Sequence, residues 1–265
     1  MQTMNVPALG WRYWVLISLA SVFGANMGDF VSHVLGLGHA RGLPVLAVVF
    51  GVVLLAERRA RVGSEAYYWL AIVAVRTAAT NLADLCTHDL RLGYEWVIAG
   101  LALLLVLTVL SGRLVAASVE ARRAIAPESV PETDARYWTA MLTAGTLGTA
   151  LGDYAAGGLG VGASSIAFVA LLAVVLAFGH RADTELCYWL TIVIIRTAGT
   201  NVGDFLAGRD GLDLGLRVST ACTGLLLLGT ALVWRQRPDA ASAVPSLYPI
   251  AAAAKTRRSA SGRAP

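Results

Sequence analysis

The chain has 265 residues, of which 57% are hydrophobic and only 14% charged, and its formal net charge is +4. With a mean hydropathy of +0.65, this balance excludes an ordinary soluble globular protein. The positive charge lies mostly in loops and in the carboxy-terminal segment, so it indicates membrane topology and gives no case for a nucleic-acid partner. The expected partner is the lipid bilayer.

Apolar segments of helix length recur along the whole chain. A bilayer core of about 30 Å is crossed by roughly 20 helical residues. The expected transmembrane spans are 11–31, 42–57, 67–87, 95–112, 136–156, 163–179, 187–207 and 214–234. The segments 42–57 and 163–179 are short for a transmembrane helix. Each could cross the bilayer with little tilt or enter it only partly as a re-entrant segment. The predicted fold is an all-α polytopic membrane protein with eight helices in four tandem two-helix repeats.

A polar connector, 113–135, separates a first half, 1–112, from a second half, 136–236, and the two halves are expected to be pseudo-symmetric. Residues 237–265 have the composition of a disordered tail. Fifteen lysine and arginine residues fall on the side of the two termini and four on the other side. The positive-inside rule therefore predicts that both termini are cytoplasmic.

One helix occurs four times, and each copy ends in an aspartate 15 positions after a tryptophan. The copies are 14–29, 69–84, 138–153 and 189–204, and a tyrosine precedes every tryptophan. All copies share one orientation because each repeat contains two spans. The Tyr-Trp pairs are then expected at the cytoplasmic membrane interface, where amphipathic aromatic rings settle.

Each copy has two contrasting faces. At 100° per residue, positions 8, 11, 12 and 15 after the tryptophan form one polar stripe about 100° wide. Apart from the threonines at position 8, the stripe contains Thr80, Thr149, Thr200, Asn26, Asn81, Asn201, Asp29, Asp84, Asp153 and Asp204. Small residues at positions 10 and 14 occupy nearly the opposite face and predict close helix packing: Gly24, Gly28, Ala79, Ala83, Gly148, Gly152, Gly199 and Gly203. A polar stripe is costly in lipid, so the first helix of each repeat should line the bundle centre.

The four aspartates lie near the carboxy ends of their helices, where the helix dipole disfavours negative charge. Two interpretations remain open. The carboxylates either serve a transport function, or they cap the following turn by accepting backbone hydrogen bonds near recurrent glycines such as Gly36 and Gly160.

Arg76 and Arg196 stand at position 7 of repeats 2 and 4 only. An arginine inside the membrane is normally paired or faces a hydrated cavity. The two guanidinium groups either face each other across a pseudo-twofold axis, where they bind an anion or neutralise acids, or extend to the membrane interface.

His33 and His88 each follow an aspartate, Asp29 and Asp84, by four positions, which places the pairs on one helix face. These residues are candidate ligands of a divalent metal ion, with His39 and Asp89 close by. A histidine at a helix carboxy end is also favourable without any metal.

The four-copy pattern Tyr-Trp…Gly-Thr-x-x-Gly-Asp…Gly-Leu-Gly resembles a family of bacterial integral membrane proteins built from a repeat of unknown function. It is carried by Tyr13-Trp14, Gly24, Gly28-Asp29 and Gly36-Leu37-Gly38 in repeat 1 and by the equivalent residues of repeats 3 and 4. Repeat 4 matches less closely at its end, Gly211-Leu212-Asp213, and repeat 2 departs from the pattern with Ala79, Ala83 and Arg91-Leu92-Gly93. The resemblance implies the architecture and a bacterial inner-membrane location, and it implies no substrate.

The chain contains no Walker loop, GxSxG, HExxH or kinase motif, so we expect no enzymatic activity and no cofactor. The favoured hypothesis is a small transporter or channel for an ion or small polar solute, whose path the Thr, Asn and Asp stripes and the two arginines line. The alternative is a membrane assembly or sensory protein whose polar stripes hold the helices together.

Overall fold

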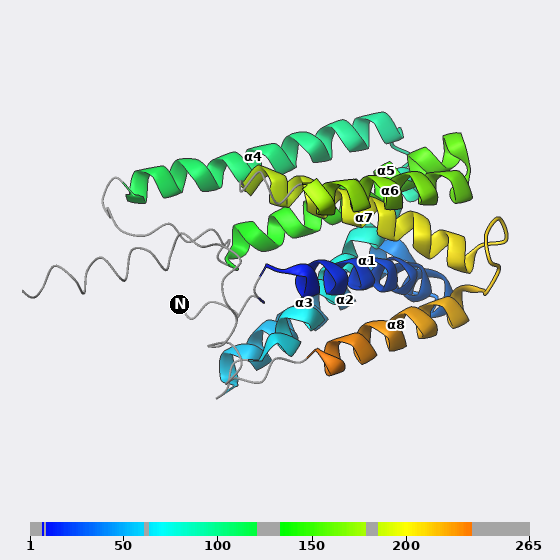
Figure 1. Ribbon diagram of the computed structural model, residues 1–265, viewed down its shortest axis with the longest axis horizontal. Helices are drawn as coiled ribbons and strands as arrows, with labels where there is room; N and C mark the ends of the chain where they lie inside the picture. Colours follow the sequence, from blue (N-terminus) through cyan, green and yellow to red (C-terminus); the bar gives the residue numbers. More distant parts are fainter. Residues whose placement is uncertain (1–6, 8, 61–63, 121–132, 179–184, 235–265) are drawn as a thin grey trace, which may run out of the picture. The chain divides into compact units, whose positions relative to one another are not determined.

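Eight helices make up the part of the chain that the structure, a computed structural model, describes: residues 7, 9–60, 64–120, 133–178 and 185–234 (Figure 1). They are α1 (Trp11–Asp29), α2 (Gly38–Arg59), α3 (Glu65–Asp84), α4 (Tyr94–Glu120), α5 (Ala135–Leu159), α6 (Val161–Phe178), α7 (Glu185–Ala207) and α8 (Leu216–Val233). No strand occurs within these ranges, and the predicted all-α fold is confirmed.

The helix ends differ from the predicted ones for local reasons. The Ser64 hydroxyl accepts a hydrogen bond from the backbone N–H of Ala66 at 3.3 Å, and Asp134 accepts one from Tyr137 at 2.8 Å, so both residues cap the helices that follow them. Helix α4 continues to Glu120, into the predicted connector, because residues 113–120 are mostly good helix formers. The connector residues 121–132 and the predicted tail 237–265 lie outside the described ranges.

The structure is that of a polytopic membrane protein. Six segments of the described chain are long and apolar enough to cross a bilayer: Trp11–Val34, Gly38–Arg59, Glu65–Asp89, Tyr94–Ser111, Val161–Phe178 and Leu216–Val233. Both segments that were predicted to be short are among them. Helices α5 and α7 are not, because threonines and glycines lower the hydropathy of α5, and Arg196, Asn201 and Asp204 lower that of α7. Each of these two helices packs beside one of the spanning helices α1 and α3, so all four run through the same layer.

The first helices of the four repeats form a closed ring. Helix α1 contacts α3, α3 contacts α5, α5 contacts α7, and α7 returns to α1. The second helices pack outside the ring, each against the first helix of the next repeat: α2 on α3, α4 on α5 and α6 on α7. Helix α8 closes the cycle on α1, since Asn26 donates a hydrogen bond to Ser219 at 2.6 Å. The prediction that the first helices line the centre is confirmed, and the ring extends the expected twofold relation to a fourfold one.

The small residues at position 10 explain how the ring packs so tightly. Each lies against position 7 of the next helix around the ring. A Cβ atom at Gly24 would lie 2.8 Å from the Cβ of Arg76, and one at Gly148 would lie 2.9 Å from the backbone nitrogen of Thr197, next to Arg196. Where position 10 carries a methyl group, as in Ala79, the facing position 7 is Gly145. A glycine therefore faces an arginine at two seams, and small residues face each other at the other two, where Ala79 meets Gly145 and Gly199 meets Ser21.

Candidate functional site

The axis of the helix ring is closed at one end by four tyrosine hydroxyls, one from each repeat. Hydrogen bonds join Tyr13 to Tyr68 at 3.0 Å, Tyr68 to Tyr137 at 2.6 Å, Tyr137 to Tyr188 at 3.2 Å and Tyr188 to Tyr13 at 2.7 Å. All four side chains are buried. The tyrosine hydroxyls take their hydrogen-bond partners from one another at the axis, and the expected position of the Tyr-Trp pairs at the cytoplasmic membrane interface stays a prediction. We call this side of the ring the tyrosine end.

Every fourth residue after the tyrosines faces the same axis. The next layer is apolar and fully buried, and consists of Ile17, Ile72, Met141 and Ile192. The third layer contains Ser21, Arg76, Gly145 and Arg196, the fourth contains Ala25, Thr80, Thr149 and Thr200, and the last contains the four aspartates. Successive axial layers are thus hydroxyl, apolar, cationic, hydroxyl and acidic. The opposite side of the ring is the aspartate end.

Arg76 fills the axis below the aspartates and has an exposed fraction of 0%. Its Nη1 donates to Thr80 at 2.9 Å and to Thr149 at 2.7 Å, its Nη2 donates to Thr200 at 2.6 Å, and its Nε donates to Ser21 at 3.4 Å. The guanidinium group therefore bonds to all three other helices of the ring. Of the two interpretations left open for this arginine, extension to the membrane interface is wrong.

The four predicted aspartates converge on one cavity of about 680 Å³ at the aspartate end. Its walls are formed by Asp29, His33, His39, Asp84, His88, Tyr94, Asp153, Ala156, Asp204, Ala207, Gly208 and Leu216. Among the described residues, no hydrogen bond or ion pair engages the side chain of Asp29, Asp153 or Asp204. Capping of the following turn therefore does not account for these three carboxylates.

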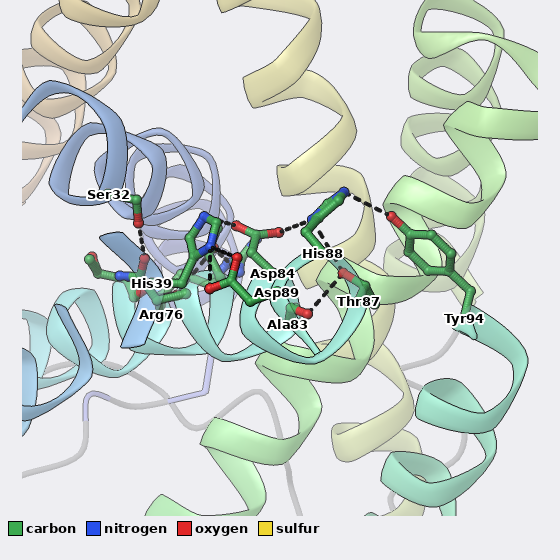
Figure 2. Close-up of polar contacts among 12 residues, drawn as sticks. Ser32, His39, Arg76, Ala83, Asp84, Thr87, His88, Asp89 and Tyr94 are labelled. Carbon is green, nitrogen blue, oxygen red and sulfur yellow. Dashed lines mark hydrogen bonds and ion pairs between the residues drawn. The ribbon is translucent and has the colours of Figure 1, made fainter. Parts of the chain in front are cut away.

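The side of the cavity formed by repeats 1 and 2 carries a chain of histidine and aspartate contacts (Figure 2). The Nδ1 atom of His39 lies 3.1 Å from Asp89, and its Nε2 lies 3.8 Å from Asp84, which is within ion-pair range but beyond a hydrogen bond. On its other side Asp84 lies 3.5 Å from Nδ1 of His88, whose Nε2 is 3.4 Å from the hydroxyl of Tyr94. His88 has a 59% exposed side chain and lies at the rim.

A π-helical turn follows Asp29 and another follows Asp84, over Phe30–Val34 and Leu85–Asp89. The wider turn carries His33 and His88 around the end of the ring helix. The predicted contact between Asp84 and His88 forms, whereas His33 stacks edge-on against His39 at 5.5 Å between ring centroids. No three His, Cys, Asp or Glu side chains in the described chain are arranged to hold a metal ion, so the metal hypothesis gains no support.

The asparagines of the predicted polar stripe do not reach the axis. Asn81 accepts a hydrogen bond from the hydroxyl of Ser32, Asn201 accepts one from Ser164 at 2.6 Å, and Asn26 donates to Ser219. Position 12 is turned about 100° from position 11, toward the helices outside the ring. The asparagines therefore clasp neighbouring helices, while the threonines at position 11 and the aspartates at position 15 face inward.

Sequence reasoning missed the tyrosine ring and Tyr94 of the cavity wall. The sequence contained a signal for the ring, because a tyrosine precedes each tryptophan. An apolar residue follows this tyrosine by four positions, and the residue at position 7 follows it by eight. A row drawn at every fourth residue would have joined the tyrosines, arginines, threonines and aspartates, although each step of four residues turns about 40° around the helix.

A family model described as a repeat of unknown function, DUF347, matches the chain four times, over residues 12–62, 67–115, 136–184 and 187–237. These four matches coincide with the four predicted repeats, so the predicted repeat organisation is confirmed. No curated protein and no solved structure matches the chain.

Proposed function

Because the chain belongs to the family of the DUF347 repeat, whose description assigns no activity, we propose a function from the geometry of the axis. The protein is a small membrane transporter, not an enzyme, and its acidic cavity binds a cation or a cationic polar solute.

One observation carries this proposal: all four repeats direct a carboxylate into a single cavity, and no described lysine or arginine forms an ion pair with any of them. Negative charges that are gathered near a low-dielectric region repel one another and concentrate cations. A cavity of about 680 Å³ lies within the usual range of roughly 300–1,000 Å³ for small-molecule sites. It therefore has room for a hydrated ion or a small organic cation.

The rest of the axis supports a carrier rather than an open channel. Beyond the aspartates, Arg76 occupies the centre, and the apolar layer and the tyrosine ring follow. A fixed guanidinium in a pore excludes cations. Passage therefore requires Arg76 to leave the threonine hydroxyls, so that the site is exposed to the two sides of the membrane in turn.

The charge distribution supports one orientation. The positive-inside rule assigns both termini and the tyrosine end to the cytoplasm of a bacterial inner membrane. In this orientation the acidic cavity faces outward and collects its substrate from outside the cell.

The test is uptake by purified protein in proteoliposomes, measured for alkali, divalent and organic ammonium cations. We expect Asp204→Asn to reduce the uptake of the transported cation about tenfold or more, since it removes one charge from the binding site. Asp210→Asn is the matched control, because Asp210 lies on the exposed turn after α7 and outside the cavity wall. Equal effects of the two substitutions, or no uptake of any cation by the wild type, would overturn the proposal.

Two observations favour a second function, that of a non-transporting assembly or sensory protein. The tyrosine end is closed by a complete ring of hydrogen bonds, and the asparagines clasp helices. Cation binding that stabilises the protein without any flux would support this second function and exclude transport.

A further inference from the structure

Arg76 and Arg196 hold equivalent positions in helices α3 and α7, yet their surroundings are unequal. All three nitrogen atoms of Arg76 donate to oxygen atoms. Arg196 has only a contact from Nη2 to the sulfur of Met141 at 3.9 Å, and its Nε and Nη1 have no hydrogen-bond partner among the described residues. Both side chains have an exposed fraction of 0%.

The two guanidinium groups point in opposite directions along the axis. Arg76 extends to the threonine layer and there binds Thr149 and Thr200. These acceptors are already used, and a second cation beside Arg76 would be repelled. Arg196 instead extends toward Met141, in the apolar layer on the side of the tyrosine ring. The charge of Arg196 is thus placed where the protein offers few acceptors.

No carboxylate of the described residues neutralises the charge of Arg196. No ion pair joins it to a described carboxylate. The tyrosine ring does not supply a negative charge, because its four hydrogen bonds require all four hydroxyl hydrogens. An unpaired buried charge with unsatisfied N–H groups is strongly unfavourable, and burial of a guanidinium normally comes with a negative partner.

We propose that Arg196 binds a small monovalent anion, for which chloride is the simplest ligand, through its free Nε and Nη1 donors. The surrounding layers are fully buried and largely apolar, which favours an anion that gives up its hydration shell easily. This site lies on the far side of Arg76 from the acidic cavity, and it does not depend on the proposed transport of cations. The bound anion removes the second positive charge from the axis and leaves Arg76 as the one cation that faces the aspartates.

The test is the melting temperature of the purified full-length protein in sodium chloride, bromide and gluconate at equal ionic strength. A ligand that binds only the folded state raises the melting temperature in a saturable way. We expect a rise of roughly 3–6 °C in chloride or bromide over gluconate when the halide is about tenfold above its dissociation constant. Equal melting temperatures in the three salts would contradict the proposal.

Substitution assigns the effect to one residue. Arg196→Met should abolish the difference between halide and gluconate, because it removes both the charge and the donors. The control is Arg217→Met, since Arg217 is exposed on α8 and a change there removes only non-specific surface binding. A halide effect that survives in Arg196→Met but is lost in Arg217→Met would place the anion elsewhere and refute the assignment.

Crystals grown in bromide provide a second readout on the wild-type protein, which decides the matter even if Arg196→Met does not fold. The expected result is an anomalous difference peak within hydrogen-bond distance of Nε or Nη1 of Arg196. Density for ordered water only at these atoms would overturn the proposal. Neither result depends on cation uptake, so this inference and the proposed function can fail separately.

Discussion

Single residues decide how closely the ring helices approach. Gly24 and Gly148 each face the Cβ of an arginine on the next helix, where no further atom fits. The arginines need this room because their side chains leave the helix at a seam before they turn along the axis. The glycines at these seams therefore make room for the buried arginines, and each feature depends on the other.

Gly24→Ala should destabilise the protein by about 1–3 kcal/mol, the usual cost of overpacking, because the new Cβ meets the base of the Arg76 side chain and cannot be avoided by a rotamer change. Gly51→Ala is the control, since a Cβ at Gly51 meets nothing within 4 Å. It should be neutral or stabilise the helix by up to about 1 kcal/mol. Reversible unfolding in detergent measures both changes, and equal effects would show that the seam is loose.

Pairs of elements are joined by polar contacts that repeat around the ring. Asn201 on α7 accepts a hydrogen bond from the hydroxyl of Ser164 on α6, and Asn26 on α1 donates one to the hydroxyl of Ser219 on α8. In repeat 3 the equivalent position is Ala150, and no such clasp joins α4 to α5 there. Hydrogen bonds between helices in a membrane contribute modestly, about 0.6 kcal/mol on average. The clasps therefore set the register of the helices more than the stability of the whole.

A double-mutant cycle with Asn201→Ala and Ser164→Ala should give a coupling energy of about 0.5–1.5 kcal/mol. The same cycle with Asn201→Ala and Ser111→Ala is the control, because Ser111 on α4 bonds only within its own helix, to Thr108. Its coupling should be zero within error. A coupling below that error for the first pair would mean that the clasp does not hold the two helices.

The tyrosine ring joins four helix ends at once, so its members should not act independently. Tyr13→Phe removes the two hydrogen bonds to Tyr68 and Tyr188 and should cost about 1–3 kcal/mol. Tyr137 faces Tyr13 across the ring. Tyr137→Phe should reduce the free energy of unfolding less in the Tyr13→Phe background than in the wild type, because the ring is already broken there. Unfolding of the two single variants and the double variant measures this, and strictly additive losses would contradict a cooperative ring.

At the scale of the whole molecule, four copies of one helix produce an axis with different ends. At the tyrosine end four neutral hydroxyls close the axis, whereas the aspartate end holds a cavity with four carboxylates. Two of the four copies carry arginine at position 7, so the fourfold ring has only a twofold distribution of positive charge. Arg76 takes the threonine hydroxyls, whereas Nε and Nη1 of Arg196 have no acceptor among the described residues. Even the twofold relation between the two arginines is therefore unequal.

The orientation of the molecule can be tested with fusions of reporter proteins. Green fluorescent protein at the carboxy terminus should fluoresce, because the positive-inside rule predicts a cytoplasmic terminus. Alkaline phosphatase fused after Leu92, at the aspartate end, should be active, since that enzyme folds only outside the cytoplasm. Activity of the phosphatase at the carboxy terminus would reverse the orientation and turn the acidic cavity toward the cytoplasm.

The sequence alone determined the all-α membrane fold, the four repeats and the central position of the first helices, because apolar length and a fixed spacing of polar residues follow from helix geometry. It also identified the four aspartates as one set. Only the tertiary structure decided which polar residues share the axis, since neighbouring positions such as Thr200 and Asn201 are about 100° apart and face different helices. The contact between α7 and α1, which closes the ring, joins residues 175 positions apart, such as Tyr13 and Tyr188. The tyrosine ring, the different surroundings of the two arginines and the acidic cavity all depend on this closure.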